Sequence, residues 1–527
     1  MSTTLPEVEA PISEPQSPEL PDATYLEDQT PDWFKTPRSL FGFTTVIGAI
    51  YWIFSYRPLW HTDLWGHLSY GRLLWQGQRL PSTEPLMPLS SGVPFVDTAW
   101  LSQLIGYGAI SAFGIPAMQF LYAGSITLCV ALLAWRFFRR TGNTWISIAG
   151  LAAFVWLNWQ QLFVIRPQLA GLVCFVSLLV MMTSRHWSRA NWVVVPLLFA
   201  LWANLHGSFP VGLAFLGCLF VGRACDVAWK TRSLGSIVRD TKVKRYFLLA
   251  ELAAAAALLN PYGLALYAEI LSVSGNANFA DLVEWEPLTL RMRQGWAAAA
   301  IAMALMFVYR RTPRRVSTAE VLLLLGFGAA TLWISRMIVW WAPVAAYYLV
   351  LHGGAVWKRH RSRRPLAEPP TRRSLWSVVS LGSIWIFFAY TPFGITVLHG
   401  SNERFERSVS TETPVEAVKY LNEYPPVGQI FNTYEWGDYL TWAGPKSLQV
   451  FVASHVHLVP REVWQDYLAV INVSSGWEGI LDRYSVNTII VDPLRREALI
   501  DRLRRDDQWT LGFEDNRAVV FNRRNPI

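Results

Sequence analysis

Charged residues are scarce in this chain: they make up 16% of its 527 residues, whereas 52% are hydrophobic. Soluble globular domains usually contain about 25% charged residues. Several apolar runs also approach the length of about 17–25 residues that crosses a bilayer as a helix. The composition excludes an ordinary soluble protein and indicates a polytopic α-helical membrane protein.

Cysteine is almost absent as well. The chain has four cysteines, all within or beside apolar runs, and none has the spacing of a metal site: Cys129, Cys174, Cys218 and Cys225. We therefore expect neither a disulfide framework nor a cysteine-based metal centre.

No basic residue precedes Lys35, and the segment 1–38 alternates acidic residues with prolines. Such a segment cannot bury a core, so we predict a disordered acidic tail in the cytosol. The tail also places the first apolar run too far along the chain for a usual cleaved signal peptide.

Apolar runs follow in succession, and we expect each to cross the membrane, about eleven crossings in all. Basic residues cluster in alternate connections, which the positive-inside rule places in the cytosol. The net charge of +8 lies mostly there and indicates orientation, not nucleic-acid binding. We therefore predict a multi-pass protein of the plasma (inner) membrane with a cytosolic amino terminus. The predicted spans are 39–56, 115–135, 144–165, 167–184, 191–206, 208–228, 246–261, 294–309, 317–335, 337–356 and 375–397.

The segment 98–113 is apolar but does not fit this alternation. Counting it as a crossing would invert every later connection and place the basic clusters outside. We therefore predict an interfacial or re-entrant helix on the outer side, within a first outer loop of residues 57–114.

The start of that loop concentrates reactive groups, in the stretch His-Thr-Asp-Leu-Trp-Gly-His-Leu-Ser-Tyr-Gly-Arg from His61 to Arg72. If a helix begins near Gly66, Asp63 and His67 lie four residues apart and could share one face. A carboxylate beside an imidazole could take or hold a proton. The alternative is that these residues only cap and hydrate the end of a helix.

The other outer connections also contain ionisable residues: Arg166, His206, Glu284 and Arg336. Ionisable groups gathered on one side of a membrane domain favour a shared aqueous cavity. Each residue taken singly also has a structural explanation, since an arginine can snorkel to the interface and Asn-Pro-Tyr-Gly at 260–263 is a helix stop.

The order of the motifs resembles that of bacterial GT-C-type membrane glycosyltransferases, among which protein mannosyltransferases and lipid A aminoarabinose transferases are the better-known relatives. Each motif is short, but the ordered series covers nearly everything from residue 39 onward. The series is Asp-Leu-Trp-Gly-His-Leu-x-x-Gly-Arg, Pro81-x-x-Glu-Pro, Trp100-Leu-Ser-Gln, Arg166-Pro-Gln, Trp202-Ala-Asn-Leu-His-Gly, Asn260-Pro-Tyr-Gly, Glu284-Trp and Phe431-Asn-Thr-Tyr-Glu-Trp-Gly-Asp-Tyr-Leu.

This resemblance implies a glycosyltransferase that moves a sugar from a polyprenyl-phosphate donor, on the outer face of the membrane, to a lipid, glycan or protein acceptor. An acidic residue of the first outer loop is essential in such relatives. By position that role falls to Asp63, as general base, with His67 as its orienting neighbour. Mannosyltransferases have an Asp-Glu pair there, whereas Leu64 follows Asp63 in this chain, so the resemblance leaves donor and acceptor open.

The chemistry of sugar transfer suggests roles for the other ionisable residues. A phosphate leaving group favours the planar fork of an arginine, so Arg166 and Arg336 are the first candidates and Arg72 the third. Glu84, Asp97, His206 and Glu284 complete the predicted substrate-binding set, with Trp65 or Trp285 stacking against a sugar. Metal dependence is left open, because a divalent ion could be bound by Asp63, His67, Glu84 and Asp97.

From about residue 398 the long apolar runs stop, and we predict a small extracytoplasmic α/β domain, 398–527, following the membrane domain, 39–397. It is expected to recognise an acceptor or cover the cavity. His455 and His457 flank Val456, which suits one face of an ordinary edge strand. The predicted strands are 427–431, 448–452, 487–491 and 518–521, and the predicted helices are 414–424, 461–471 and 493–505.

A different class of protein is also compatible with the sequence: a non-catalytic transporter, or a binding and assembly component for lipid-linked glycans. A transporter would show internal repeats and broken spans that face both sides. The chain has no evident repeat, and its polar residues gather on one side, which favours the enzyme.

Overall fold

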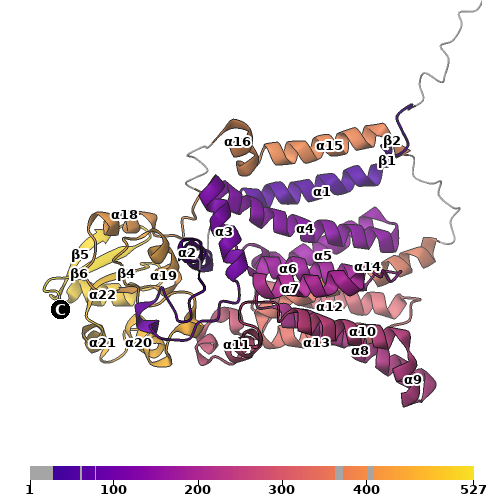
Figure 1. Ribbon diagram of the computed structural model, residues 1–527. Helices are drawn as coiled ribbons and strands as arrows, with labels where there is room; N and C mark the ends of the chain where they lie inside the picture. The colour runs from indigo at the N-terminus through magenta and orange to yellow at the C-terminus, as the bar shows by residue number, and fades with distance from the viewer. Residues whose placement is uncertain (1–27, 60–61, 78, 362–371, 401–407) are drawn as a thin grey trace, which may run out of the picture.

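A computed structural model of the chain describes residues 28–59, 62–77, 79–361, 372–400 and 408–527. A bundle of long helices forms one part, and an α/β domain formed by the residues from 408 onward lies against one end of it (Figure 1). The predicted fold class, a helical membrane domain followed by a small α/β domain, is confirmed.

Each predicted apolar run forms a helix or a bent pair of helices. Several helices continue past the apolar stretch into a last turn of basic residues, such as Arg139 and Arg140, because the helix dipole favours cations at this end. The helices are α1 (Arg38–Ser55), α4 (Ile115–Thr141), α5 (Thr144–Leu162), α6 (Gln168–Met182), α7 (Asn191–Leu205), α8 (Phe209–Thr231), α10 (Thr241–Ala256), α12 (Arg293–Arg311), α13 (Thr318–Trp333), α14 (Ile338–Arg361), α15 (Ser374–Ala389) and α16 (Pro392–His399). Two further short helices are α9 (Leu234–Arg239) and α11 (Leu264–Ser274).

By length and composition, 3 of the described helices could each cross a membrane: α4, α8 and α14 with the turn that precedes it. A fourth crossing results if α15 and α16, which are bent by 86° at their junction, form one span. The helices α6, α7 and α13 are apolar but shorter. The structure is thus that of a membrane protein, and the number of about eleven crossings stays a prediction.

The predicted first outer loop contains two helices, α2 (Thr62–Gly77) and α3 (Trp100–Phe113). Helix α3 has 14 residues, so its length of about 21 Å is less than the hydrocarbon core of a bilayer. It runs across the end of the bundle (Figure 1), as expected for an interfacial helix. A Cβ atom on Gly71 would lie 2.3 Å from the carbonyl oxygen of Gln103, so α2 and α3 approach as closely as only glycine allows.

Motif residues hold the ends of the helices together on this side. Trp202 is fully buried, and its Nε1 donates to Ser208 Oγ at 3.0 Å. Asn204 accepts a hydrogen bond from Trp100 Nε1 at 2.9 Å and donates one to the carbonyl of Leu259 at 2.8 Å. These contacts join α3, α7 and the end of α10, so the motif Trp202-Ala-Asn-Leu-His-Gly stabilises the packing of these helix ends.

The C-terminal domain contains a sheet of four strands in the order β3–β4–β6–β5, of which only β3 and β4 are parallel. Helices α18, α20 and α22 match the three predicted helices closely. The elements are α18 (Val415–Glu423), β3 (Gln429–Asn432), α19 (Tyr434–Ala443), α20 (Arg461–Ile471), α21 (Trp477–Arg483), β4 (Val486–Val491), α22 (Glu497–Arg505), β5 (Trp509–Glu514) and β6 (Val519–Arg523).

One predicted strand, 448–452, is wrong. The segment forms a single bridge, between Gln449 and Gln429, and then leaves the sheet. Its next backbone groups pair with a side chain instead: Asn432 Oδ1 accepts from the N–H of Phe451 at 2.8 Å, and Asn432 Nδ2 donates to the carbonyl of Val452 at 2.9 Å. The carboxamide thus replaces a strand partner.

Residues 1–27 of the predicted tail lie outside the described residues. The described end of that segment is ordered: β1 (Thr36–Pro37) pairs antiparallel with β2 (Arg372–Arg373), and α1 begins at Arg38. This pairing connects the start of α1 to the start of α15.

Candidate active site

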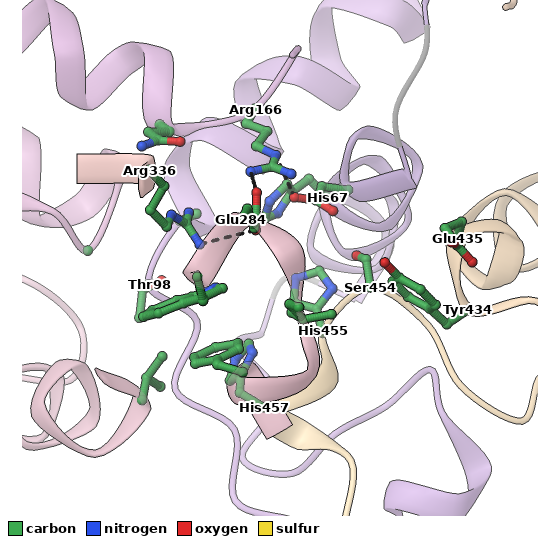
Figure 2. Close-up of a pocket in the computed structure, with 18 of the residues that line it drawn as sticks. His67, Thr98, Arg166, Glu284, Arg336, Tyr434, Glu435, Ser454, His455 and His457 are labelled. Carbon is green, nitrogen blue, oxygen red and sulfur yellow. Dashed lines mark hydrogen bonds and ion pairs between the residues drawn. The ribbon is translucent and has the colours of Figure 1, made fainter. Parts of the chain in front are cut away.

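A cavity of about 760 Å³ lies between the bundle and the C-terminal domain. Ionisable side chains from both parts project into it (Figure 2). Its bundle wall is mostly apolar beyond these groups and includes Pro210, Val211, Ile270, Val273, Ile334, Met337 and Trp340. Its other wall is mostly polar and includes Thr433, Tyr434, Glu435, Ser454, His455, His457, Asp492, Arg495 and Arg517.

Four charged side chains form a continuous chain on the bundle side. Asp63 Oδ2 lies 2.7 Å from Arg166 Nε, and Arg166 Nη1 lies 2.8 Å from Glu284 Oε2. Glu284 Oε1 in turn lies 3.3 Å from Arg336 Nη1 (Figure 2). Acidic and basic side chains alternate in this series, so the formal charges of the four groups cancel.

Each of the four groups is placed by the end of an element. Asp63 lies in the first turn of α2, which begins at Thr62 and not near Gly66 as predicted; a carboxylate is favoured there by the helix dipole. Arg166 lies in the connection between α5 and α6. Two 3₁₀ turns, η4 (Val283–Trp285) and η5 (Ser335–Met337), carry Glu284 and Arg336.

The two 3₁₀ turns are joined by local contacts. Ser335 Oγ donates to the carbonyl of Glu284 at 3.1 Å. The guanidinium of Arg336 lies 5.0 Å from the ring centre of Trp285, which itself stacks on Phe279 with ring centres 4.1 Å apart. Trp285 thus contacts both the guanidinium of Arg336 and the ring of Phe279.

The pKa shifts of Glu284 and Arg166 favour their charged forms. Burial would raise the pKa of Glu284, but the charges of Arg336 and Arg166 outweigh it and leave the pKa lowered. Burial likewise opposes the charge of Arg166, and the carboxylates of Asp63 and Glu284 leave its pKa raised. The site therefore presents two fixed guanidinium groups, each held by carboxylates.

Four histidines line the cavity and are neutral near pH 7. Burial lowers the pKa of His67 to about 4 and the pKa of His206, His455 and His457 to about 3. The predicted strand placement of His455 and His457 is wrong: they lie at a 3₁₀ turn, η6 (Val456–Leu458), and both rings point into the cavity (Figure 2). The ring centres of His67 and His455 are 5.1 Å apart.

A carboxamide connects His67 to Asp97. Gln103 Nε2 lies 2.9 Å from Asp97 Oδ1 and 3.2 Å from His67 Nδ1. An amide NH₂ has two protons to donate, so it can donate to both neighbours; if His67 Nδ1 accepts, the proton of the neutral imidazole is on Nε2. Burial raises the pKa of Asp97 to about 7, and among the described residues its buried Oδ2 has no hydrogen-bond partner.

Seven of the nine predicted site residues line this one cavity: Asp63, His67, Asp97, Arg166, His206, Glu284 and Arg336. Glu84 does not. Its carboxylate accepts hydrogen bonds from the hydroxyl of Tyr70 at 2.7 Å and from the backbone of Leu86 and Met87. That contact set is complete within the outer loop and suits a structural role.

Arg72 also lies outside the cavity. It donates to the carbonyls of Thr441 and Trp442 at 3.2 and 3.1 Å, at the end of α19, and its guanidinium lies 4.7 Å from the ring centre of Trp442. It therefore joins α2 to the C-terminal domain.

Sequence reasoning did not select several residues that line the cavity: Gln103, Tyr434, Glu435, Asp492, Arg495 and Arg517. Gln103, Tyr434 and Glu435 belong to two of the sequence motifs, Trp100-Leu-Ser-Gln and Asn-Thr-Tyr-Glu-Trp-Gly-Asp. These motifs were the signal by which the three residues could have been selected. Within the part of the chain that the structure describes, no group of three or more His, Cys, Asp or Glu side chains is arranged to hold a metal ion.

No protein-family model matches the chain, and no curated protein matches its sequence. Its structure is similar to the archaeal oligosaccharyltransferase AglB from Archaeoglobus fulgidus, solved with an inhibitory peptide and a dolichol-phosphate: the TM-score is 0.54 at 10% identity, over 88% of this chain and 69% of that chain. A second structure of that oligosaccharyltransferase, tethered to an acceptor peptide, gives a TM-score of 0.52 at 12% identity, over 94% and 75%.

The arabinofuranosyltransferase AftD from Mycobacteria gives a TM-score of 0.50 at 14% identity, over 91% of this chain and 40% of that chain. At these identities the likeness concerns the fold. The resemblance noted in the order of the sequence motifs is confirmed at that level.

Proposed function

We propose that this chain, which has the GT-C fold, is a membrane glycosyltransferase that moves a sugar from a polyprenyl-phosphate donor to an acceptor hydroxyl. The observation that carries the proposal is the alternating chain of two carboxylates and two arginines in a cavity between the membrane domain and a polar domain. The similarity to an oligosaccharyltransferase solved with dolichol-phosphate supports it.

The cavity has one wall for each half of such a donor. The apolar side chains that begin α8, line α11 and precede α14 suit an isoprenoid tail. Arg166 and Arg336 suit the phosphate, because a guanidinium offers planar paired donors to phosphate oxygens. Both arginines line the cavity from the bundle side.

Donor binding would change the partner of Asp63. Arg166 is paired with Asp63 and Glu284, and these carboxylates neutralise the charge of its guanidinium group. A lipid phosphate that takes over Arg166 would leave the Asp63 carboxylate beside a second negative charge, and its pKa would rise. Phosphate binding thus turns a paired carboxylate into a competent base.

The transfer step then balances as follows. Asp63 takes the proton of the acceptor hydroxyl, whose oxygen forms a bond to the anomeric carbon of the sugar. The bond from that carbon to the phosphate oxygen breaks, and its electron pair stays with the polyprenyl phosphate, which Arg166 and Arg336 stabilise. His67, held by Gln103 with its proton on Nε2, donates a hydrogen bond to the substrate.

Asp97 is a second candidate for the base. Its pKa of about 7 suits proton transfer near neutral pH, and its free Oδ2 is buried at the cavity wall. The pH profile of transfer distinguishes the two. With Asp97 as base the rate rises through about pH 7 and becomes flat in Asp97→Asn at a much lower level, whereas with Asp63 as base Asp97→Asn keeps most of the activity.

Binding of the donor lipid tests the proposal directly. Undecaprenyl phosphate would be titrated into the full chain in nanodiscs, with Arg166→Met, Arg336→Met and, as a control, Arg504→Met on the surface of the C-terminal domain. Each charged hydrogen bond lost should weaken binding by about tenfold or more, and the control should bind normally.

Unchanged lipid binding in both cavity variants would make these arginines structural and contradict the proposal. Lipid binding without turnover, across a broad panel of lipid-linked sugars, would instead identify a non-catalytic binding component.

A further inference from the structure

We propose that the acceptor is an uncharged carbohydrate, and that it binds where the C-terminal domain closes the cavity, beside the carboxyl ends of β3 and β4. The proposal deepens the proposed function, since an acceptor site has meaning only if the chain transfers a sugar. It gives the C-terminal domain a binding role.

The location follows from the topology of the sheet. Strands β3 and β4 are parallel, and at their carboxyl ends the chain continues into Thr433 and Asp492, both of which line the cavity. The N–H of Asp492 donates to Thr433 Oγ1 at 3.4 Å, which holds the two strand ends together. The crevice at the carboxyl ends of parallel strands is where α/β domains bind ligands.

The charged groups at this crevice are paired with one another. Arg495 lies 2.9 Å from Glu435 and 3.6 Å from Asp492, while Arg517 lies 2.9 Å from Glu412 and 3.6 Å from Asp492. Two guanidinium groups thus face three carboxylates, so the crevice has little net attraction for a phosphate or another strongly anionic acceptor.

The same arrangement suits sugar hydroxyls. Carboxylate acceptors and guanidinium donors alternate along the crevice, and a hydroxyl both donates and accepts. Glu435 Oε2 is buried at the cavity wall and has no hydrogen-bond partner among the residues that the structure describes, so it can accept a further hydrogen bond. An O–H of a neutral sugar satisfies it without bringing a second charge into the site.

Aromatic rings complete the crevice. Tyr434 lies beside Glu435 at the cavity (Figure 2), and Trp436 lines it from the same helix. The guanidinium of Arg517 lies 5.6 Å from the ring centre of Trp436, whose Nε1 donates to the carbonyl of Glu412 at 3.3 Å. Tyr434, whose ring has apolar faces and a polar hydroxyl, suits the C–H face of a sugar, while the buried Trp436 contacts Arg517.

A peptide acceptor is less compatible with this crevice. A peptide commonly adds as a strand to a free sheet edge. The outer edge of β3 is already covered by the segment 449–452: the N–H of Ile430 donates to the carbonyl of Gln449 at 2.9 Å, and the side chain of Asn432 bonds to Phe451 and Val452. No strand can be added at that edge without displacing this segment.

The test is acceptor binding in the absence of donor. Neutral, uronic-acid and amino-sugar oligosaccharides, with peptides as a separate panel, would be screened by saturation-transfer NMR on the full chain in nanodiscs. Neutral oligosaccharides should bind, and Arg495→Gln and Glu435→Gln should each weaken the best of them by about tenfold. Arg504→Gln is the matched control, since Arg504 is similarly exposed and paired with Glu514 outside the cavity.

Binding of undecaprenyl phosphate, measured in the same samples, separates the two proposals. If it binds the wild type and depends on Arg166 while no neutral glycan binds, the acceptor proposal is overturned and the proposed function is not. Preferential binding of anionic glycans or peptides, or equal glycan binding by Arg495→Gln and Arg504→Gln, overturns it as well.

Discussion

In the bundle, the ion pairs at the cavity are partly buried, whereas those of the C-terminal domain include well-exposed side chains. None of the four bundle side chains is more than 33% exposed, while Arg495, paired with Glu435, and Glu412, paired with Arg517, are 52% and 56% exposed. Exposed pairs are weak and rearrange easily, but a buried charge that loses its partner is costly. The two guanidinium groups of the bundle wall are therefore held in place, whereas the ion pairs of the facing wall can rearrange.

This difference fits the chemistry proposed for each wall. A phosphate leaving group needs charges held in one place before the reaction begins, so that no reorganisation is required. An acceptor needs side chains that can exchange partners as hydroxyls arrive. The predictions below test this contrast, beginning with the largest effect.

Sidedness is the all-or-none prediction. Single cysteines at Gly92 and Asp507 should react with an impermeant thiol reagent only from outside the cell, and those at Arg139 and Arg314 only from the cytosol. Cys225, the exposed native cysteine, would first be replaced by alanine. Labelling of the first two positions from opposite sides would mean that α3 crosses the membrane.

Asp63→Asn should have the largest effect on chemistry. It preserves size but removes the proton acceptor, so transfer should fall by about 100-fold or more while thermal stability changes little. Glu514→Gln, at an exposed ion pair of the C-terminal domain, is the control and should transfer normally. Full activity in Asp63→Asn would assign the proton to Asp97 or Glu284.

Acid should destabilise the fold through the neutral histidines. Their pKa values of about 3 to 4 lie below the value of 6.5 expected in an unfolded chain, so the unfolded state binds more protons between these limits. Stability is then complete above about pH 6.5 and is lost as pH falls toward 4. Melting curves of a His455→Gln, His457→Gln double variant should show a smaller loss over this range than the wild type.

Asp97 acts in the opposite direction. Its pKa of about 7 lies above its ordinary value of 3.8, so its burial weakens the fold as pH rises between these limits. Asp97→Asn should therefore gain stability relative to the wild type as pH rises from about 4 to 7. A constant difference across that range would contradict the raised pKa.

The smallest predicted effect concerns Gln103. Gln103→Met removes the donor to His67 Nδ1, so transfer should fall by about tenfold with little change in donor affinity. Gln103→Glu should place the His67 proton on Nδ1, which ¹⁵N chemical shifts report, with His67→Asn for assignment. The same ¹⁵N shifts in wild type and Gln103→Glu would show that Gln103 does not set the tautomer.

The helices could be predicted because burying apolar runs in a membrane leaves few alternatives. The charged site residues of the bundle were found for a related reason: a charge near a membrane is costly unless it has a role, which singled out Arg166, Glu284 and Arg336. The same argument also selected Glu84 and Arg72, which lie outside the cavity, because the sequence does not show that groups within the protein satisfy them.

Neutral and loop residues carried no comparable signal. Gln103 and Tyr434 are ordinary polar residues until folding brings them to the cavity. The apolar residues of the segment 448–452 are buried, as expected for a strand. The strand prediction failed because the side chain of Asn432 provides the hydrogen bonds that a neighbouring strand would provide. A side chain that takes the place of a strand partner leaves no periodic pattern in the sequence that could be detected.

Helix α2 has a mechanical consequence. It carries Asp63 in its first turn, its Gly66 lies so close to α19 that a Cβ would be 2.6 Å from Asp438 Oδ1, and its Arg72 grips two carbonyls at the end of α19. A hinge motion of the C-terminal domain would therefore move α2 and, with it, the proposed base Asp63. We therefore expect substrates to enter and leave through the opening and the sides of the cavity while the two domains stay together. A cross-link between α2 and α19 should then leave turnover intact.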